Sequence, residues 1–581
     1  MRKSYIASAL FFIFLFSSCK KYLDIDPKDK LTIDQAFSSE ATLQLYINGF
    51  YTKMLPTAAS IYSGDVTSDI TVPTVTPDYL LGNITQYNVS GWDWTNLRNV
   101  NYFLVHNNNS SLSSEVRNHY SGIARFFRAY FYFGMVKRFG DVPWYSSPLD
   151  VEDSTLYKKK DPRTLVMDSV LADINFACEN IDDAKDNSCS NVTKWVALAL
   201  KARICLFEGT FRKYHTDLSL SGTSATWLTA AADAAEEIIN SGNYSLLSGN
   251  PSADYRSLFI SETPVAQEVL LASVYDNSLQ KWHASTYWYN SPTTGSRLSL
   301  DKYFVNTYLN IDGSRFTDNS NYTTKTFQEE TQGRDYRLGE TIRLGSYMRS
   351  DGSDGFPNFN VTITGYHILK FSLDDPYYDS RSESYNSIPI FRYAEVLLNY
   401  AEAMAELGVL TADEWSKTIG ALRSRAGIEN TSMPVTADSY LQNTFYPGIS
   451  DAVLLEVRRE RAIELACEGF RYDDLLRWKC ADNMQRYYTG MYVPALNQLI
   501  DLNNDGTPDV CFVSATPAAT VTGVVYVTLN GVVSKLSEDD KGYILWNINQ
   551  PKTFDDYKYF YPIPNAEILL NPQLEQNEGW Q

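Results

Sequence analysis

Hydrophobic residues recur at helical spacing through most of the first half of the chain. In TNLRNVNYFLVHNN, Leu97, Val100 and Leu104 share one face, which predicts a helix from about Thr95. Residues 115–139, EVRNHYSGIARFFRAYFYFGMVKRF, are apolar on nearly all sides. This predicts a long, central and buried helix that ends at Gly140.

Further helices are predicted on both sides of the chain's middle. DPRTLVMDSVLADINFACENI places Asp161 as the N-cap and Pro162 at the first helical position. Residues 193–214 and 226–242 predict two more helices, the second closed by Gly242. Residues 390–408, IFRYAEVLLNYAEAMAELG, predict another, ended by Gly408.

The segment that follows Gly408 predicts a helical hairpin. Thr411 and Glu414 form a capping box that opens the next helix, which continues through Ser424. DAVLLEVRRERAIELACEGFRYDDLLRW then predicts a long helix, broken near Gly469. The paired helices are of roughly the size of tetratricopeptide units.

Two stretches do not follow the helical pattern. Residues 243–385 are rich in loop formers. In VVYVTLNGVVSKL, Asn530-Gly531 lies between β-branched runs, which predicts a small β-hairpin. The fold class is therefore mainly α, with helix pairs, long loop-rich insertions and a small hairpin.

The first residues predict export from the cytoplasm. Arg2 and Lys3 precede an apolar run, Ile6 to Phe16, far shorter than the roughly 20 residues of a membrane-spanning helix. This is typical of a signal peptide, residues 1–18. The sequence LFSSC resembles a bacterial lipobox and predicts lipidation at Cys19; the alternative is an ordinary signal peptide with an incidental cysteine.

Composition and charge exclude several functions. The formal net charge is −19 and no basic cluster is present, which disfavours nucleic-acid binding. Neither a CxxC nor an HExxH motif occurs among the 7 Cys and 5 His, so no zinc ligand set is visible. Cys178 and Cys189 either pair as a disulfide or remain buried thiols.

Several segments together resemble the SusD/RagB family of surface lipoproteins from Bacteroidetes-type bacteria. They cover nearly the whole mature chain in the family's order: the lipobox with YLDIDPKD, ARFFRAYFYFGMVKRFGDVPW, FRYAEVLLNYAEAMAELG, LRSRAG, EVRRERAIELACEGFRYDDLLRW and FYPIPNAEILLNPQLEQNEGW. The resemblance implies a SusD-like domain over residues 19–581. Its parts are a helical segment to about 245, a loop-rich ligand segment at about 246–385, and a helical and loop segment from about 386.

The resemblance also implies a function and a partner. It implies a non-catalytic lipoprotein of the outer membrane, facing the exterior, that captures oligosaccharides and delivers them to a SusC-like TonB-dependent transporter. Peptide capture, as in RagB-like members, is the alternative. A glycoside hydrolase is a third reading, but no catalytic motif such as GxSxG, a P-loop or GxGxxG appears where it would count.

The stretch QKWHASTYWYNSPTTG concentrates large rings among loop-forming residues, which suggests an exposed aromatic surface. Aromatic faces bury the C–H face of a sugar, and polar side chains bond its hydroxyls. Mapped by position, the resemblance implies a glycan site made of Asp65, Asp69, Trp92, Trp94, Arg98, Asn101, Trp282, Tyr287, Trp288 and Tyr289.

Within that set, we expect Trp92 and Trp288 to stack on sugar, and Asp69 and Asn101 to form hydrogen bonds. The competing interpretation is structural. In it, Trp94 anchors the helix at 95–105 in the core, while Tyr287 and Tyr289 face inward.

Two acidic motifs remain. Glu460, Glu464 and Glu468 lie on one helix face beside Arg461, which predicts an ion-pair network that ties helices together rather than a catalytic pair. DLNNDGTPD predicts a structural Ca²⁺ loop through Asp501, Asn503, Asp505, Thr507 and Asp509, or else a turn capped by its own side chains.

Overall fold

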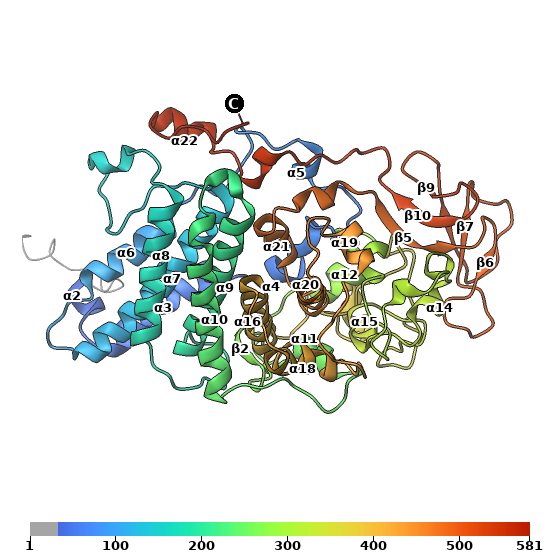
Figure 1. Ribbon diagram of the computed structural model, residues 1–581, viewed down its shortest axis with the longest axis horizontal. Helices are drawn as coiled ribbons and strands as arrows, with labels where there is room; N and C mark the ends of the chain where they lie inside the picture. Colours follow the sequence, from blue (N-terminus) through green and yellow to red (C-terminus); the bar gives the residue numbers. More distant parts are fainter. Residues whose placement is uncertain (1–32, 581) are drawn as a thin grey trace, which may run out of the picture.

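The structure, a computed structural model, describes residues 33–580. The signal peptide and Cys19 lie outside these residues. Long helices fill one half of the molecule, and the loop-rich middle of the chain with the small C-terminal sheets fills the other (Figure 1). Helices α16 (Tyr393–Leu407), α20 (Ala452–Glu464) and α21 (Arg471–Arg477) lie between the two halves.

The helical half is built from neighbouring helices packed in chain order. Helix α7 packs against α3, α6 and α8, while α9 packs against α8 and α10, and α10 packs against α16. This arrangement of helix pairs confirms the mainly helical class. The helices up to residue 241 are α2 (Ile33–Ala36), α3 (Glu40–Met54), α4 (Ala58–Tyr62), α5 (Asp78–Leu81), α6 (Thr95–His106), α7 (Ser114–Phe139), α8 (Arg163–Asn180), α9 (Lys194–Tyr214) and α10 (Ser224–Ser241).

Local capping chemistry explains most of these boundaries. The Ser113 side chain accepts a hydrogen bond from the Val116 N–H at the start of α7, and Gly140 ends the helix at φ 75°. The prediction of Asp161 as the N-cap of α8 is wrong, because Pro162 occupies that position. The Asp161 carboxylate instead accepts the Trp144 N–H at 2.7 Å.

The later helices confirm the predicted pairing, with one difference. The capping box of Thr411 and Glu414 is present, but the helix stops at Lys417 and restarts at Ile419 because Thr418 leaves helical geometry. The later helices are α11 (Asp254–Ile260), α12 (Ser285–Asn290), α13 (Lys302–Val305), α14 (Phe327–Thr331), α15 (Tyr336–Thr341), α16 (Tyr393–Leu407), α17 (Ala412–Lys417), α18 (Ile419–Arg425), α19 (Ser439–Thr444), α20 (Ala452–Glu464), α21 (Arg471–Arg477) and α22 (Asn565–Leu570).

The predicted break near Gly469 separates α20 from α21. Gly469 has φ 81°, a conformation that favours glycine. A Cβ on Gly64 would overlap the Cα of Gly469. Two glycines therefore let the segment after α4 touch the α20–α21 junction.

Four small sheets complete the fold. In the two-stranded sheets β1 pairs with β3 and β2 with β4; in the three-stranded sheets β10 lies between β5 and β9, and β7 lies between β6 and β8. The strands are β1 (Thr71–Val72), β2 (Val269–Ser273), β3 (Ser299–Leu300), β4 (Ile388–Arg392), β5 (Tyr488–Val493), β6 (Leu499–Ile500), β7 (Val510–Val513), β8 (Val525–Thr528), β9 (Ser534–Leu536) and β10 (Gly542–Trp546).

The predicted hairpin at Asn530-Gly531 is wrong. Strand β8 pairs in parallel with β7, whereas β9 pairs antiparallel with β10. The Asn530 side chain accepts the N–H groups of Val532 and Val533, so a real turn forms. That turn carries the chain from one sheet to another instead of folding it back on itself.

The acidic ladder of α20 is a buried ion-pair network, as predicted. Arg337 on α15 contacts both Glu460 and Glu464, and Arg392 on β4 contacts Glu464 and Glu468. These side chains are almost completely buried. The network therefore joins the loop-rich middle of the chain to the helices.

The disulfide alternative is excluded in this structure. Cys178 and Cys189 are both free and buried. Burial raises the pKa of Cys178 to about 12 and that of Cys189 to about 11. Both therefore behave as small core residues rather than as reactive thiols.

Candidate functional site

A cavity of about 450 Å³ opens beside the start of α6, and four of the predicted site residues reach it from the loop and the first turns of that helix. Its opposite wall comes from the segment after α7 and from α22, which follows more than 400 positions later in the chain. The lining consists of Trp92, Trp94, Thr95, Leu97, Arg98, Asn101, Pro143, Tyr145, Ser147, Pro148, Leu149, Leu156, Tyr157, Glu567, Leu570, Asn571 and Leu574.

Two half-buried tryptophans line this cavity, together with Tyr145 and Tyr157. Trp92 and Trp94 meet edge to face, with ring centroids 5.3 Å apart. Trp92 also packs on Phe139 at 5.0 Å, and Trp94 on Tyr145 at 5.6 Å. Trp94 therefore anchors the start of α6, as the structural interpretation held, while it also lines the cavity.

The polar side chains of the cavity differ in how far the protein's own hydrogen bonds and ion pairs already occupy them. Arg98 is exposed, and its nearest charge is the Asp150 carboxylate at 3.9 Å. Asn101 is buried: its Nδ2 donates to the Tyr145 carbonyl at 2.9 Å, and its Oδ1 accepts from Arg128 at 3.1 Å. The side-chain amide of Asn101 is thus committed to holding the cavity wall.

The two predicted aspartates lie away from this cavity. Asp69 forms a paired contact with the Arg471 guanidinium at 2.6 and 2.9 Å, and a longer one with Arg486 at 3.3 Å. Burial acts to raise the pKa of Asp69, but the charges of Arg471 and Arg486 hold it below its ordinary value. Asp69 is therefore an internal ion-pair partner in this structure.

Asp65 has the opposite electrostatic environment. It is 1% exposed; its Oδ1 accepts the Arg471 N–H at 3.1 Å, and its Oδ2 has no partner among the described residues. Burial raises the pKa of Asp65 to about 7. Near neutral pH this carboxyl is therefore poised between its charged and neutral forms.

The mid-chain aromatic stretch is partly helical, which the sequence did not indicate. Tyr287, Trp288 and Tyr289 lie on α12, which packs against α4 and against the 3₁₀ turn Pro376–Ser380. Tyr289 is fully buried, and its hydroxyl donates to the Tyr62 carbonyl. The expectation of four exposed rings is wrong for Tyr289, and the inward-facing interpretation is right for that ring.

The other three rings of this stretch are half-buried. The Trp282 indole donates to the Asn277 side chain at 2.9 Å. Trp288 lies 5.9 Å from the Tyr62 ring, and its buried indole N–H has no partner among the described residues. Tyr287 and Trp288 therefore retain partly exposed aromatic surface beside α4.

The structure distributes the predicted glycan-site residues over separate places. Trp92, Trp94, Arg98 and Asn101 line the 450 Å³ cavity, and none of the four mid-chain aromatic residues does. Helices α6 and α12 lie in different halves of the molecule (Figure 1). The roles of the predicted residues in ligand binding stay predictions, and the Trp92 cavity and the α12 surface each need a separate test.

Sequence reasoning missed the residues that complete both aromatic surfaces. Tyr145 and Tyr157 line the cavity with Trp92. Beside α12, Tyr377 is 49% exposed and packs on Tyr378 at 5.0 Å. The loop sequence DDPYYDSRSESY carries the same signal as the stretch around Trp288, namely large rings among turn formers.

The predicted calcium loop has its oxygens engaged with its own backbone. The Asp501 carboxylate accepts N–H groups from Asn503, Asn504 and Gly506, and Asp505 accepts the Thr507 N–H at 2.6 Å. Across residues 33–580, no group of three or more His, Cys, Asp or Glu side chains is placed to hold a metal ion. This geometry matches the self-capped turn, and calcium binding stays a prediction.

Taken together, paired helices and a surface cavity that combines tryptophans with polar side chains define a helical binding protein. Within residues 33–580 no helix has the length and apolar character needed to cross a membrane. Sequence comparison then gives the family: the SusD family model matches residues 267–580, and the chain belongs to that family. A second model, described as "Starch-binding associating with outer membrane", matches residues 21–206.

Individual relatives agree with this assignment. SusD-like protein P25 of Formosa agariphila is 24% identical over 517 residues, which cover 81% of this chain and 88% of the relative. A SusD-like protein from Bacteroides fragilis superposes with a TM-score of 0.68 at 20% identity, covering 95% of this chain and 100% of that one. A SusD-like carbohydrate-binding protein from the same species superposes at 0.67 with 21% identity, covering 93% and 99%. The SusD-like fold is thus confirmed.

Proposed function

We propose that this protein is a non-catalytic lipoprotein of the outer membrane that captures oligosaccharides. Membership of the SusD family supports the proposal, as does the likeness to a solved protein described as a SusD-like carbohydrate-binding protein. The description of the N-terminal family model, which includes association with the outer membrane, supports the location.

The observation that carries the proposal is the chemistry of the cavity at Trp92. Its half-buried indoles offer apolar faces for the C–H side of a sugar ring. Arg98, Glu567 and Asn571 add charged and polar groups around the same space. A site of about 450 Å³ with an aromatic wall and a few polar groups has the size and composition of a small-ligand pocket.

Capture implies transfer to a second protein. A lipid on Cys19 would tether the chain at the outer membrane, with its acidic body facing the exterior. A tethered body cannot carry a ligand through the bilayer, so we propose delivery to a SusC-like TonB-dependent transporter. Purification of the native complex in mild detergent tests this partner, and repeated recovery of the protein alone would count against it.

Peptide capture is the competing function. The Trp92 cavity also contains Leu149, Leu156 and Leu570, which suit apolar side chains. A glycoside hydrolase is the weaker competitor. Such an enzyme needs two carboxyls, about 5–10 Å apart, that face each other across an open cleft. The sequence shows no catalytic motif of this or another hydrolase class. Turnover of an oligosaccharide by the pure protein would support that reading.

A binding screen separates these functions. The mature chain is tested against soluble glycans by gel retention, and against a random peptide mixture by calorimetry. We expect retention by at least one glycan, its loss in Trp92→Ala, and no binding of peptides. The proposal fails if peptides alone bind, or if glycan products accumulate with time.

A further inference from the structure

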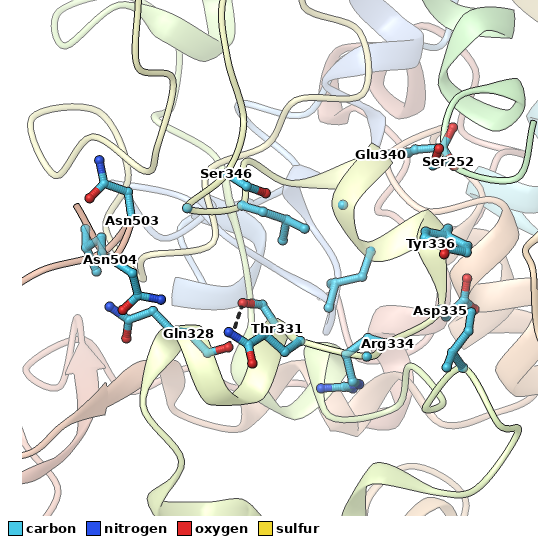
Figure 2. Close-up of a pocket in the computed structure, with 18 residues that line it drawn as sticks. Ser252, Gln328, Thr331, Arg334, Asp335, Tyr336, Glu340, Ser346, Asn503 and Asn504 are labelled. Atoms are coloured by element: carbon cyan, nitrogen blue, oxygen red, sulfur yellow. Dashed lines mark hydrogen bonds between the residues drawn. The ribbon is translucent and has the colours of Figure 1, made fainter.

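A cavity in the loop-rich half shares no lining residue with the Trp92 cavity and uses none of the predicted glycan-site residues. It has a volume of about 520 Å³ and is enclosed by α14, α15, residues 344–346 and the loop 502–504. Figure 2 shows Asn503 and Asn504 at one end of this cavity, with Tyr336 and Glu340 at the other. Segments up to about 250 positions apart in the chain therefore enclose it.

The walls of this cavity are firmly held. The Gln328 side chain donates to the carbonyl oxygen of Asp501, which ties α14 to the 502–504 loop. A Cβ on Gly345 would overlap the Leu502 carbonyl oxygen, so that segment also packs directly on the loop. A side-chain hydrogen bond and a close backbone contact thus hold the loop at 502–504 against the other walls.

Two charged residues of the lining, Arg334 and Asp335, are held mainly by the protein's own groups. The Arg334 guanidinium donates to the carbonyl oxygens of Glu330, Val305 and Tyr308. The Asp335 carboxylate is paired with Arg337 at 2.7 Å. Asp335 is thus neutralised by Arg337, and Arg334 is held by three backbone carbonyls, although its Nε has no partner among residues 33–580.

Uncharged hydrogen-bonding groups remain available. Within residues 33–580, the side-chain amides of Gln332 and Asn504 form no hydrogen bond, and both residues are exposed at the cavity. Each amide offers donors and an acceptor at once. This is the pattern that a hydroxyl group needs, because a hydroxyl also donates and accepts.

A buried carboxyl adds an unused polar atom. Glu340 lines the cavity and is only 5% exposed; its Oε2 accepts the Arg256 N–H at 2.7 Å, while Oε1 has no partner within the described chain. Burial raises the pKa of Glu340 to about 7. An unpartnered buried oxygen costs folding free energy unless some group binds it.

We propose that this cavity is a second ligand site and that it takes a neutral, hydroxyl-rich molecule about the size of a sugar ring. The side chains of Ile311, Leu338 and Leu344 supply the apolar wall for its C–H groups. Gln332 and Asn504 bond its hydroxyls at the mouth, and Glu340 bonds one deeper inside. The site is independent of the cavity at Trp92 and needs no metal.

Hydrogen–deuterium exchange locates such binding. The probes are the neutral monosaccharides glucose and galactose, each compared with the charged monosaccharides glucosamine and glucuronate. We expect a neutral probe to slow exchange in peptides that cover residues 327–346 and 499–509. The protection should persist in Trp92→Ala and disappear in the double variant Gln332→Ala/Asn504→Gly.

Controls make both outcomes informative. Asn504 has φ 62°, so glycine preserves its backbone conformation. The control variant is Asn240→Ala, which removes an exposed side-chain amide on α10, away from the cavity. It should leave the protection intact. Loss of two hydrogen bonds should weaken binding roughly tenfold or more.

The proposal is overturned if no neutral probe protects these peptides, if a charged sugar protects them better, or if the double variant is protected like the wild type. Loss of all protection in Trp92→Ala would also overturn it, and would leave the Trp92 cavity as the glycan site. Protection here without glycan retention at Trp92 would instead refute the function proposed for that cavity.

Discussion

Arg392 on β4 and Glu464 on α20 form an ion pair of 2.6 Å between Nη1 and Oε1, although 72 positions separate them. Both side chains are almost fully buried, and Glu464 also accepts from Arg337 and Arg425. Burial acts to raise the pKa of Glu464, but the three arginines hold it well below its ordinary value. One carboxylate thus joins β4, α15 and α18 to α20.

Glu464→Gln should strongly destabilise the fold. The substitution leaves three buried guanidinium groups facing a neutral amide, and breaking a buried pair typically costs about 3–5 kcal/mol. Chemical denaturation measures the free energy of unfolding. The matched control is Lys417→Met, which breaks the exposed pair with Asp413 and should leave the stability nearly unchanged, because solvent screens exposed ion pairs. Equal effects of the two variants would contradict a structural role for the network.

Two neighbouring aspartates should respond to pH in opposite ways. The folded pKa of Asp65 is about 7, above its ordinary value of 3.8, so the folded state binds the extra proton between these values. The loss of folding stability caused by ionising the buried Asp65 carboxyl is absent below about pH 4. It grows as the pH rises to 7 and stays constant above that. Asp65→Asn should therefore stabilise the protein at pH 8 by up to about 4 kcal/mol, and have little effect near pH 4.

Asp69→Asn is the control for this prediction. The pKa of Asp69 is lowered, so its ionised form stabilises the fold at neutral pH, and that stability is lost as the pH falls through the folded pKa. The Asn variant should be less stable than the wild type at pH 7, with the difference shrinking in acid. Thermal melts from pH 2 to 8 compare the two variants, and shifts of the same sign at pH 8 would refute the assignment.

Truncation of single tryptophans should separate the two aromatic surfaces. Trp92→Ala and Trp288→Ala each remove a half-buried ring, so we expect a loss of roughly 1–2 kcal/mol in stability and a folded protein. Stacking on sugar is a hot-spot contact, so the variant at the true site should lose glycan retention. Gel retention and melting curves are measured together.

Tyr87→Ala serves as the control for these variants, because Tyr87 is 77% exposed and lies outside the Trp92 cavity. It should keep both stability and glycan retention. Normal retention by both tryptophan variants would exclude both aromatic surfaces as the site. Unfolding of both would show that the rings serve the core.

Calcium should stabilise the loop at 501–509. Burial, followed by the negative charges of Asp501 and Asp505, raises the pKa of Asp509, and a bound cation would relieve that repulsion. Ca²⁺ at 100 times its Kd would add about 2.7 kcal/mol to the stability of the fold. Removal of calcium with EDTA should therefore lower Tm, and an unchanged Tm would contradict the prediction.

Variants test whether such an effect belongs to this loop. Asp505→Asn should abolish the response to EDTA. Asp351→Asn, in an exposed turn where Asp351 likewise caps its own backbone, should leave it intact. An EDTA effect that survives in Asp505→Asn would place the ion elsewhere.

The sequence by itself determined the long helices, the family and the structural role of the α20 carboxylates, but not the short helices within residues 243–385. Hydrophobic spacing set α6 and α7, Gly140 and Gly408 set helix ends, and Thr411 with Glu414 set a capping box. These features depend on residues within about four positions of each other, so a linear pattern contains them.

Tertiary structure alone decided the strand partners and the membership of each site. Strand β8 pairs with β7 rather than with β9. The Asn101 side chain forms hydrogen bonds with Arg128 and with the Tyr145 carbonyl, and the Tyr289 ring is buried in the core. Each outcome depends on contacts between residues far apart in the chain, and these compete with the local preference. Burial and polar pairing are properties of the packed neighbourhood, and so the sequence could name the aromatic and acidic residues without showing which remained free to bind a ligand.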